Sequence, residues 1–245
     1  MSLLVLGDLH GVRDWYAWTA ERIPRYDLVA LPGDLTDMSG NDWPRQKDFV
    51  RDWIADAARF GTPLAWCSGN HDTSRWSFDY PSALPPGGCW TDRLRHPSVV
   101  GDLETKCFQT RKGAPFIVTS LPDGIHQTDP WMRACLCALD EGASARDRVK
   151  APWIILAHEP PSGLPISEGD GGVPCGSDFI RSWIERFSPD ILLSGHHHAA
   201  PLRHGVSSRL NSTLCINPGC DFGSAAPRHV VVDVEAGTAI VGGAV

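Results

Sequence analysis

The sequence lacks any long hydrophobic run and any cluster of basic residues. Its apolar stretches are far shorter than the roughly 20 residues that a membrane-spanning helix needs, and no basic segment with an apolar core stands at the start of the chain. We therefore expect a cytoplasmic protein that does not associate with membranes. The net charge of −7, with Lys and Arg spread along the chain, does not indicate nucleic-acid binding, although a basic groove could still form in the folded protein.

The cysteines do not show the pattern of a disulfide-rich or thiolate-rich protein. Cys135 and Cys137 form a closely spaced pair, but no matching pair accompanies them. Cys67 and Cys215 lie in strand-like runs, where a thiol packs as a small apolar side chain. We expect the cysteines to be reduced and structural.

What the sequence does contain is a recurring pattern of short apolar runs that end in metal-binding residue types. The runs lie at 3–6, 28–31, 64–67, 153–156 and 191–193. The residues that follow them include Asp8, His10, Asp34, Asn70, His71, Asp72, His158, His196 and His198. A nearly continuous apolar run bounded by turn residues indicates a strand buried on both faces, as in a parallel sheet. Because the carboxyl ends of such strands share one edge, the sequence predicts one site assembled from across the chain.

The spacing of apolar residues between these runs predicts helices. They are expected over residues 12–23, 46–60, 130–139 and 179–187, with a polar, charged segment from 140 to 150. Further strands are expected over 99–109, 115–120, 213–216, 229–234 and 238–241. The alternation of strand and helix is typical of a βαβ sheet. Because dividing the chain would separate the ligand segments, we predict a single domain over residues 1–245.

The candidate ligands combine carboxylates, imidazoles and one amide oxygen. Such a set suits transition metals such as Mn, Fe or Zn better than metals that prefer thiolates. Asp8 and His10, like His196 and His198, are two residues apart and would point to the same side of an extended segment. A two-metal centre needs about eight ligand positions around ions roughly 3.5–4 Å apart. Seven of the candidates fill eight positions if Asp34 bridges both ions: Asp8, His10, Asp34, Asn70, His158, His196 and His198.

The ordered motifs resemble those of the calcineurin-like metallophosphoesterases. They are Asp8-x-His10, Gly33-Asp34, Gly69-Asn70-His71-Asp72, His158 and Gly195-His196-x-His198, followed by Asn217-Pro218-Gly219. The resemblance runs through residues 5–220 and implies a four-layer αββα sandwich of two mixed β-sheets flanked by helices. It also implies a dinuclear metal site at the C-terminal edge of the strands and a metal-dependent phosphoester hydrolase.

The same resemblance implies a role for each site residue. One metal ion would be held by Asp8, His10 and His198, the other by Asn70, His158 and His196, with Asp34 bridging both. A hydroxide between the ions would be the nucleophile, because bound metals lower the pKa of water. His71 would donate a proton to the leaving group, and Asp72 would orient His71.

The segment after the bridging carboxylate bears on the substrate. Residues 33–38 contain no arginine, whereas phosphoprotein phosphatases of this superfamily use one there to clamp phosphate. This favours a phosphodiesterase that acts on a small-molecule or nucleotide phosphoester; nucleic acid is possible but not indicated. A phosphomonoesterase or nucleotidase is the alternative, and a non-catalytic scaffold is disfavoured by the complete ligand set. Arg75, Arg93 and Arg95 are candidates for a clamp supplied from elsewhere.

Several other polar and aromatic residues carry less information. Asp37 is more typical of a solvated turn residue, and His197 is expected to point away as a non-ligand. Trp76 and Trp90 are interpreted as core residues, although they could also wall a substrate cleft. The residues without a motif context are His96, His126, His204 and His229. The loops 73–97 and 160–176 are expected to set substrate specificity.

Overall fold

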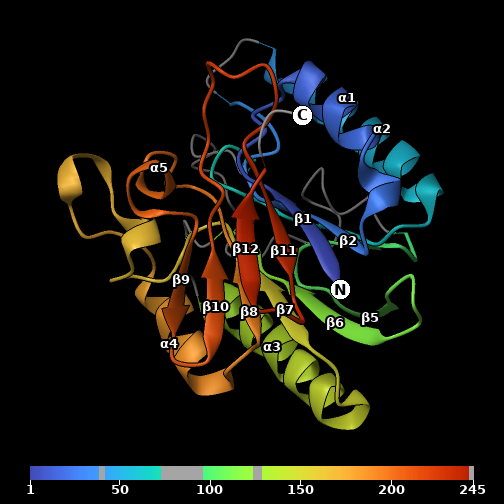
Figure 1. The fold of residues 1–245 in the computed structure, drawn as a ribbon, viewed down its shortest axis with the longest axis vertical. Coiled ribbons are helices and arrows are strands. Elements are labelled where there is room, and N and C mark those ends of the chain that lie inside the picture. Colours follow the sequence, from blue (N-terminus) through green and yellow to red (C-terminus); the bar gives the residue numbers. More distant parts are fainter. Residues whose placement is uncertain (39–41, 73–95, 124–128, 243–245) are drawn as a thin grey trace.

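The protein forms two mixed β-sheets that pack face to face, with helices on their outer sides (Figure 1). The computed structural model describes residues 1–38, 42–72, 96–123 and 129–242. Each sheet has six strands within these residues. The predicted four-layer αββα architecture is confirmed. The predicted loop 73–97 falls almost wholly outside the described residues, together with Arg75, Arg93, Arg95, Trp76, Trp90 and His126.

The first sheet has the strand order β12-β11-β1-β2-β3-β4. Its strands are β1 (Ser2–Leu6), β2 (Leu28–Pro32), β3 (Leu64–Cys67), β4 (Val99–Val100), β11 (His229–Asp233) and β12 (Thr238–Val241). Strands β1 to β4 are parallel to one another. On the other side of β1, β11 pairs antiparallel with β1, and β12 pairs antiparallel with β11. The helices α1 (Arg13–Ala20) and α2 (Trp43–Ala57) cover its outer face and continue into the short helices η1 (Ile23–Arg25) and η2 (Ala58–Phe60).

The second sheet has the strand order β5-β6-β7-β8-β10-β9. Its strands are β5 (Thr105–Gln109), β6 (Pro115–Ser120), β7 (Trp153–Leu156), β8 (Ile191–Leu193), β9 (Ser207–Leu210) and β10 (Thr213–Ile216). The four central strands are parallel and the two edge strands antiparallel. The helices α3 (Asp129–Val149) and α4 (Asp178–Phe187) cover its outer face. The other helices among the described residues are η4 (Pro165–Ser167), η5 (Asp170–Gly172) and α5 (Ala200–His204).

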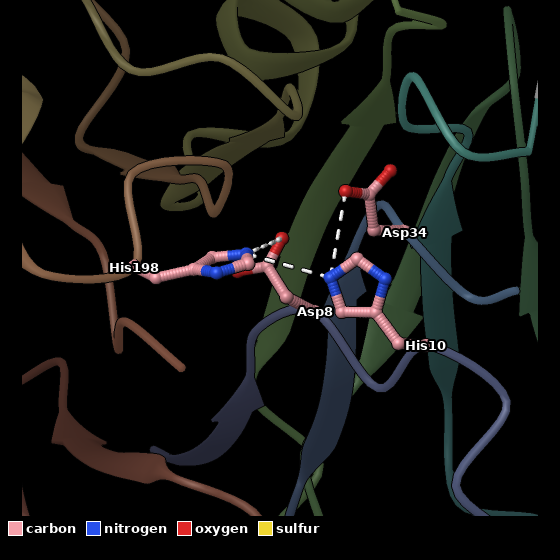
Figure 2. Close-up of side chains that lie close together, drawn as sticks. All are labelled: Asp8, His10, Asp34 and His198. Carbon is pink, nitrogen blue, oxygen red and sulfur yellow. Dashed lines mark hydrogen bonds and ion pairs between the residues drawn. The ribbon is translucent and has the colours of Figure 1, made fainter. Parts of the chain in front are cut away.

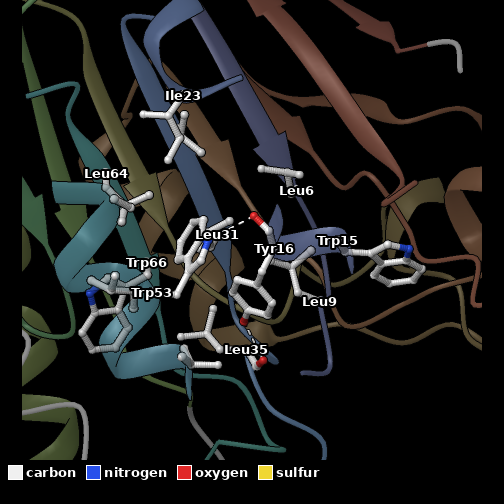
Figure 3. Packing of buried hydrophobic residues seen from close by; sticks show 14 of the residues in the cluster. Leu6, Leu9, Trp15, Tyr16, Ile23, Leu31, Leu35, Trp53, Leu64 and Trp66 are labelled. Carbon is white, nitrogen blue, oxygen red and sulfur yellow. Dashed lines mark hydrogen bonds between the residues drawn. The ribbon is translucent and has the colours of Figure 1, made fainter. Parts of the chain in front are cut away.

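Strand residues alternate between two hydrophobic layers, as the period of two in an extended chain requires. In β1, Leu3 and Val5 belong to the layer between the sheets, whereas Leu4 and Leu6 pack toward α1 and α2. Figure 3 shows the outer cluster, in which the Tyr16 hydroxyl donates a 2.7 Å hydrogen bond to the Leu35 carbonyl. Because Leu35 follows Asp34, this buried contact ties the end of β2 to α1.

Two sequence predictions about the middle of the chain are wrong. The strand expected over 99–109 is two strands, β4 and β5, which belong to different sheets. A turn separates them, with Leu103 in a left-handed conformation at φ 61°. The charged segment 140–150 is also helical, because α3 continues to Val149. Its Ala145 is buried against the sheet while charged neighbours face solvent, an amphipathic pattern that a purely compositional reading misses.

Two further observations concern the described residues alone. None of their helices is both long enough and apolar enough to cross a membrane. The cysteines among them are all free, and Cys67, Cys135 and Cys215 are buried, in line with structural thiols.

Candidate metal centre

The candidate metal ligands lie in loops at the carboxyl ends of parallel strands from both sheets. The first sheet supplies Asp8 and His10 after β1, Asp34 after β2 and Asn70 after β3. The second sheet supplies His158 after β7, and His196 and His198 after β8. All seven predicted ligand positions therefore lie along one edge of the sandwich, and the site spans the two sheets. Their roles as ligands stay predictions.

One group of donors surrounds His10 (Figure 2). Its Nε2 atom lies 3.4 Å from Nε2 of His198 and 3.7 Å from Oδ2 of Asp34. Nε2 of His198 lies 3.9 Å from Oδ1 of Asp8. The donor atoms of these four residues all lie within 4.8 Å of one another, which is compact enough for one metal ion to bind several of them.

A second group of donors surrounds the amide oxygen of Asn70. This oxygen lies 3.1 Å from Nε2 of His158 and 2.9 Å from Nδ1 of His196. The two imidazole nitrogens are 3.2 Å apart. Oδ2 of Asp34 is 3.3 Å from Nε2 of His158, so the same carboxylate oxygen contacts both donor groups. Asp34 thus lies between the two donor groups, and its role as a bridging ligand stays a prediction.

Two local features indicate that these residues are suited to binding metal ions. Nδ1 of His158 contacts the carbonyl oxygen of Pro32 at 2.9 Å, which directs its Nε2 toward the centre and is the usual orientation of a metal-binding histidine. Oδ2 of Asp8 is buried and has no hydrogen-bond partner among the described residues. Because a buried carboxylate oxygen without a partner is costly, a metal ion there would satisfy it.

Burial and mutual charge shift the pKa values of the cluster in different directions. Burial raises the pKa of Asp8 to about 7, although His158 opposes the shift. Burial also disfavours ionisation of Asp34, but the neighbouring His158 and His10 outweigh it and hold the Asp34 pKa below its usual value. Burial opposes the charged form of His158 as well, but Asp34 and Asp8 raise its pKa. A metal ion would therefore displace protons from Asp8 and His158 on binding.

The pKa values of His10 and His196 shift in the opposite direction from that of His158. Burial lowers the pKa of His10 to about 4 and that of His196 to about 3. Both rings are therefore neutral at pH 7, which is the form that binds a metal.

The ligand loops bend sharply, and this corrects one sequence argument. Asp8, His10, Asp34 and His196 all have positive φ, at 53°, 45°, 48° and 68°. Asp8 and His10 therefore do not converge by alternation along an extended segment, as predicted, but because the backbone turns at each of them. Such conformations are uncommon outside glycine and often gather at functional sites. Close packing adds a constraint, because a Cβ at Gly33 would lie 2.2 Å from Nδ1 of His158.

His71 lies at the side of the centre and is partly exposed. Its backbone N–H donates to Oδ1 of Asp34 at 2.8 Å, and its ring packs edge-on against that of His10 with centroids 4.7 Å apart. Nδ1 of His71 lies 3.1 Å from Oδ1 of Asp37. The expectation that Asp37 is merely a solvated turn residue is therefore wrong, because its carboxylate positions the imidazole.

Asp72 lies at the junction of two of the loops that carry candidate ligands. Its carboxylate accepts hydrogen bonds from the backbone N–H groups of Leu35 at 3.0 Å, Thr36 at 2.9 Å and Gly69 at 2.9 Å. These contacts join the loop after β2 to the loop after β3. The role of Asp72 in orienting His71 stays a prediction.

Sequence reasoning also missed Glu159. Its carboxylate forms a further cluster of donors with His196 and His197. Only its place next to His158 could have indicated it. The expectation that His197 is not a ligand stays a prediction.

An αββα sandwich with Asp and His side chains from both sheets gathered at one edge is the architecture of a dinuclear metallohydrolase. The family model for calcineurin-like phosphoesterases matches residues 1–200. The chain belongs to this family and is a phosphoesterase, as the ordered motifs predicted.

Solved structures share the fold at low sequence identity. TT1561 of Thermus thermophilus is 17% identical with a TM-score of 0.66, over 98% of this chain and 97% of the other. A dimetal phosphatase from Danio rerio is 13% identical with a TM-score of 0.54, over 94% and 91%. The phosphopantetheinyl hydrolase PptH from Mycobacterium tuberculosis is 15% identical with a TM-score of 0.53, over 90% and 89%. No curated protein sequence matches the chain.

Proposed function

We propose that this protein is a metal-dependent phosphodiesterase with two transition-metal ions, Mn, Fe or Zn, at the edge of the sandwich. Asp8, His10 and His198 would hold one ion. The other would be held by Asn70, His158 and His196, whose donor atoms lie about one hydrogen-bond length apart. Asp34 would bridge the ions, since it contacts both donor groups.

The charge around the centre is the observation that supports a diester substrate. Among the described residues, the charges that act most strongly on the pKa values of the cluster belong to Asp and His side chains, with no Lys or Arg. A phosphomonoester carries close to two negative charges at pH 7, because its second pKa is about 6. A diester carries one. A centre to which the described residues add no strong Lys or Arg charge suits the diester better.

The protein's own residues supply positioning and proton transfer. Bound metal ions would provide a hydroxide nucleophile at neutral pH and neutralise charge on the phosphoryl oxygens. Because Asp37 engages Nδ1 of His71, the other ring nitrogen, Nε2, is the one available to the substrate. The side chain of His71 is 27% exposed, so a bound ester can reach it. His71 would protonate the leaving oxygen. The buried metal ligands would exclude bulk water from the side of the phosphorus atom that the hydroxide attacks.

A phosphomonoesterase or nucleotidase is the alternative within the family. Proteins named as a phosphatase and as a phosphopantetheinyl hydrolase both share the fold, so the fold alone does not choose between ester classes. The substrate would in either case be a small-molecule or nucleotide phosphoester. We also propose that residues 1–245 act as a single domain, because each ligand group draws on both sheets.

The proposal is tested by comparing two model substrates. Metal-free protein is reloaded with Mn²⁺ and assayed with bis-p-nitrophenyl phosphate and p-nitrophenyl phosphate. We expect kcat/KM to favour the diester by roughly tenfold or more, with both activities lost in Asn70→Ala. A preference for the monoester would indicate that the protein is a phosphomonoesterase instead. Turnover of neither ester by protein that holds two metal ions would contradict the proposal.

Asp37→Asn tests the positioning of His71. The amide keeps the shape of the carboxylate but removes the charge that faces Nδ1. Partners of this kind typically contribute about 10- to 100-fold, so we expect kcat for the diester to fall by about that factor while KM changes little. Asp37→Glu, which restores the charge, should recover part of the loss. An unchanged kcat in Asp37→Asn would remove Asp37 from the site.

A further inference from the structure

Phe222 is an exposed aromatic residue at the border of the proposed metal centre. It is 59% exposed, yet its ring centroid lies 5.1 Å from that of His10 and 5.6 Å from that of His198. A single exposed hydrophobic residue is ordinary on a protein surface. Phe222 differs because its ring contacts His10 and His198, whose imidazoles are proposed to bind the same metal ion.

Trp15 supports one side of the Phe222 ring. The two rings lie 6.1 Å apart between centroids and only 15° from parallel. Trp15 itself is 2% exposed, and its Nε1–H donates to the carbonyl oxygen of Ser224 at 3.2 Å. The phenyl ring is thus stacked on a buried indole, and the surface that stays accessible lies away from it.

The loop that carries Phe222 is fixed on both sides of the ring. Before it, the Cys220 N–H donates to the His198 carbonyl at 3.4 Å, and the Cys220 thiol contacts the Asp8 carbonyl at 3.5 Å. After it, the Ser224 N–H donates to the Asp221 carbonyl at 3.1 Å. The ring is therefore held beside the centre before any ligand arrives, which reduces the entropy that binding would cost.

We propose that Phe222 is a stacking platform that selects phosphoesters carrying a planar aromatic group, such as a nucleobase. This inference rests on the proposed function, because the metal centre must hold the phosphate beside His10 and His198. An aromatic substituent on that phosphate can then stack on the accessible face of Phe222, with Trp15 behind it. Rings stack at centroid separations of about 4.5–7 Å, and one stacked base strengthens binding by roughly 5- to 150-fold.

Two phosphonates that differ in one ring test the proposal without requiring turnover. Phenylphosphonate and methylphosphonate cannot be hydrolysed as esters, and their Kd values for the Mn²⁺-loaded protein are measured by isothermal titration calorimetry. We expect the wild type to bind phenylphosphonate roughly tenfold more tightly. Phe222→Ala should remove this preference, and Phe222→Tyr should keep it. Phe60→Ala is the matched control, since Phe60 is 52% exposed but precedes β3 at the opposite end from Asn70.

The outcomes separate the stacking platform from the metal centre. Equal affinity of the wild type for both phosphonates, or a preference that persists in Phe222→Ala, would overturn the role of Phe222 alone. An equal loss of both ligands in Phe222→Ala would also overturn it, because it would show that the ring only shields the histidines. Binding of neither phosphonate by the metal-loaded wild type would instead contradict the proposed function.

Discussion

Replacing Asp34 with asparagine is expected to lower kcat/KM for bis-p-nitrophenyl phosphate by roughly a thousandfold or more. The carboxylate is almost fully buried, and its Oδ2 atom contacts His10 and His158, one from each donor group. An amide has nearly the same size but carries no charge and cannot neutralise two ions. We therefore expect the variant to lose bound metal as well as activity, measured by steady-state kinetics and by elemental analysis of the purified protein.

Asp27→Asn is the matched control for this substitution. Asp27 is also a buried carboxylate beside β2, 7% exposed, but it precedes the strand while Asp34 follows it. Its oxygens accept hydrogen bonds from the backbone N–H groups of Ser2 at 2.8 Å and Arg111 at 2.9 Å. We expect Asp27→Asn to keep its metal and near wild-type kcat/KM. If Asp34→Asn retained full activity with two metals bound, Asp34 would not be the bridging ligand.

His71→Ala is expected to have a large effect that depends on the leaving group. General acid catalysis contributes about a hundredfold to ten-thousandfold, but only where the departing oxygen needs a proton. A p-nitrophenolate leaves readily without one, whereas a more basic phenolate does not. Across a series of substituted phenyl diesters, log kcat/KM should therefore fall more steeply with leaving-group pKa in the variant than in the wild type.

The same series distinguishes proton donation from a structural role for His71. Because its backbone N–H also holds Oδ1 of Asp34 at 2.8 Å, the alanine variant keeps that hydrogen bond and loses only the ring. Damage to the metal centre would lower every rate by the same factor. Parallel plots for the variant and the wild type would therefore remove His71 as the acid.

The sequence correctly predicted the strands and candidate ligand positions that follow a simple residue pattern. It did not predict the features that depend on tertiary contacts. Short apolar runs followed by candidate ligands placed Asp8, Asp34, Asn70, His158 and His196 at the correct strand ends, because parallel strands share one edge. The division between β4 and β5 was missed because both pieces are similar in composition, and only their pairing partners assign them to different sheets.

The sequence also did not predict the backbone conformation and the side-chain contacts at the site. Positive φ is uncommon even for Asp and His, which adopt it more often than most residues, so the sequence alone does not predict it at Asp8, His10, Asp34 and His196. Asp37 reads as an ordinary turn residue until folding brings it 3.1 Å from His71. Phe222 likewise becomes a candidate site residue only because the loop after β10 packs against the loops after β1 and β8.

The division of the proposed ligands between the two sheets would determine when a metal centre can first form during synthesis. A chain emerging from the ribosome presents Asp8, His10, Asp34 and Asn70 early, but both donor groups still lack their histidines from the second sheet. His158 arrives next, and only His196 and His198 complete the two groups. Domains fold as their segments emerge, so this protein would acquire its ions late, after most of the sandwich has been made. A nascent chain stalled before β8 would hold Asp34 and two of the three proposed ligands of each ion, and it would compete poorly for scarce metal.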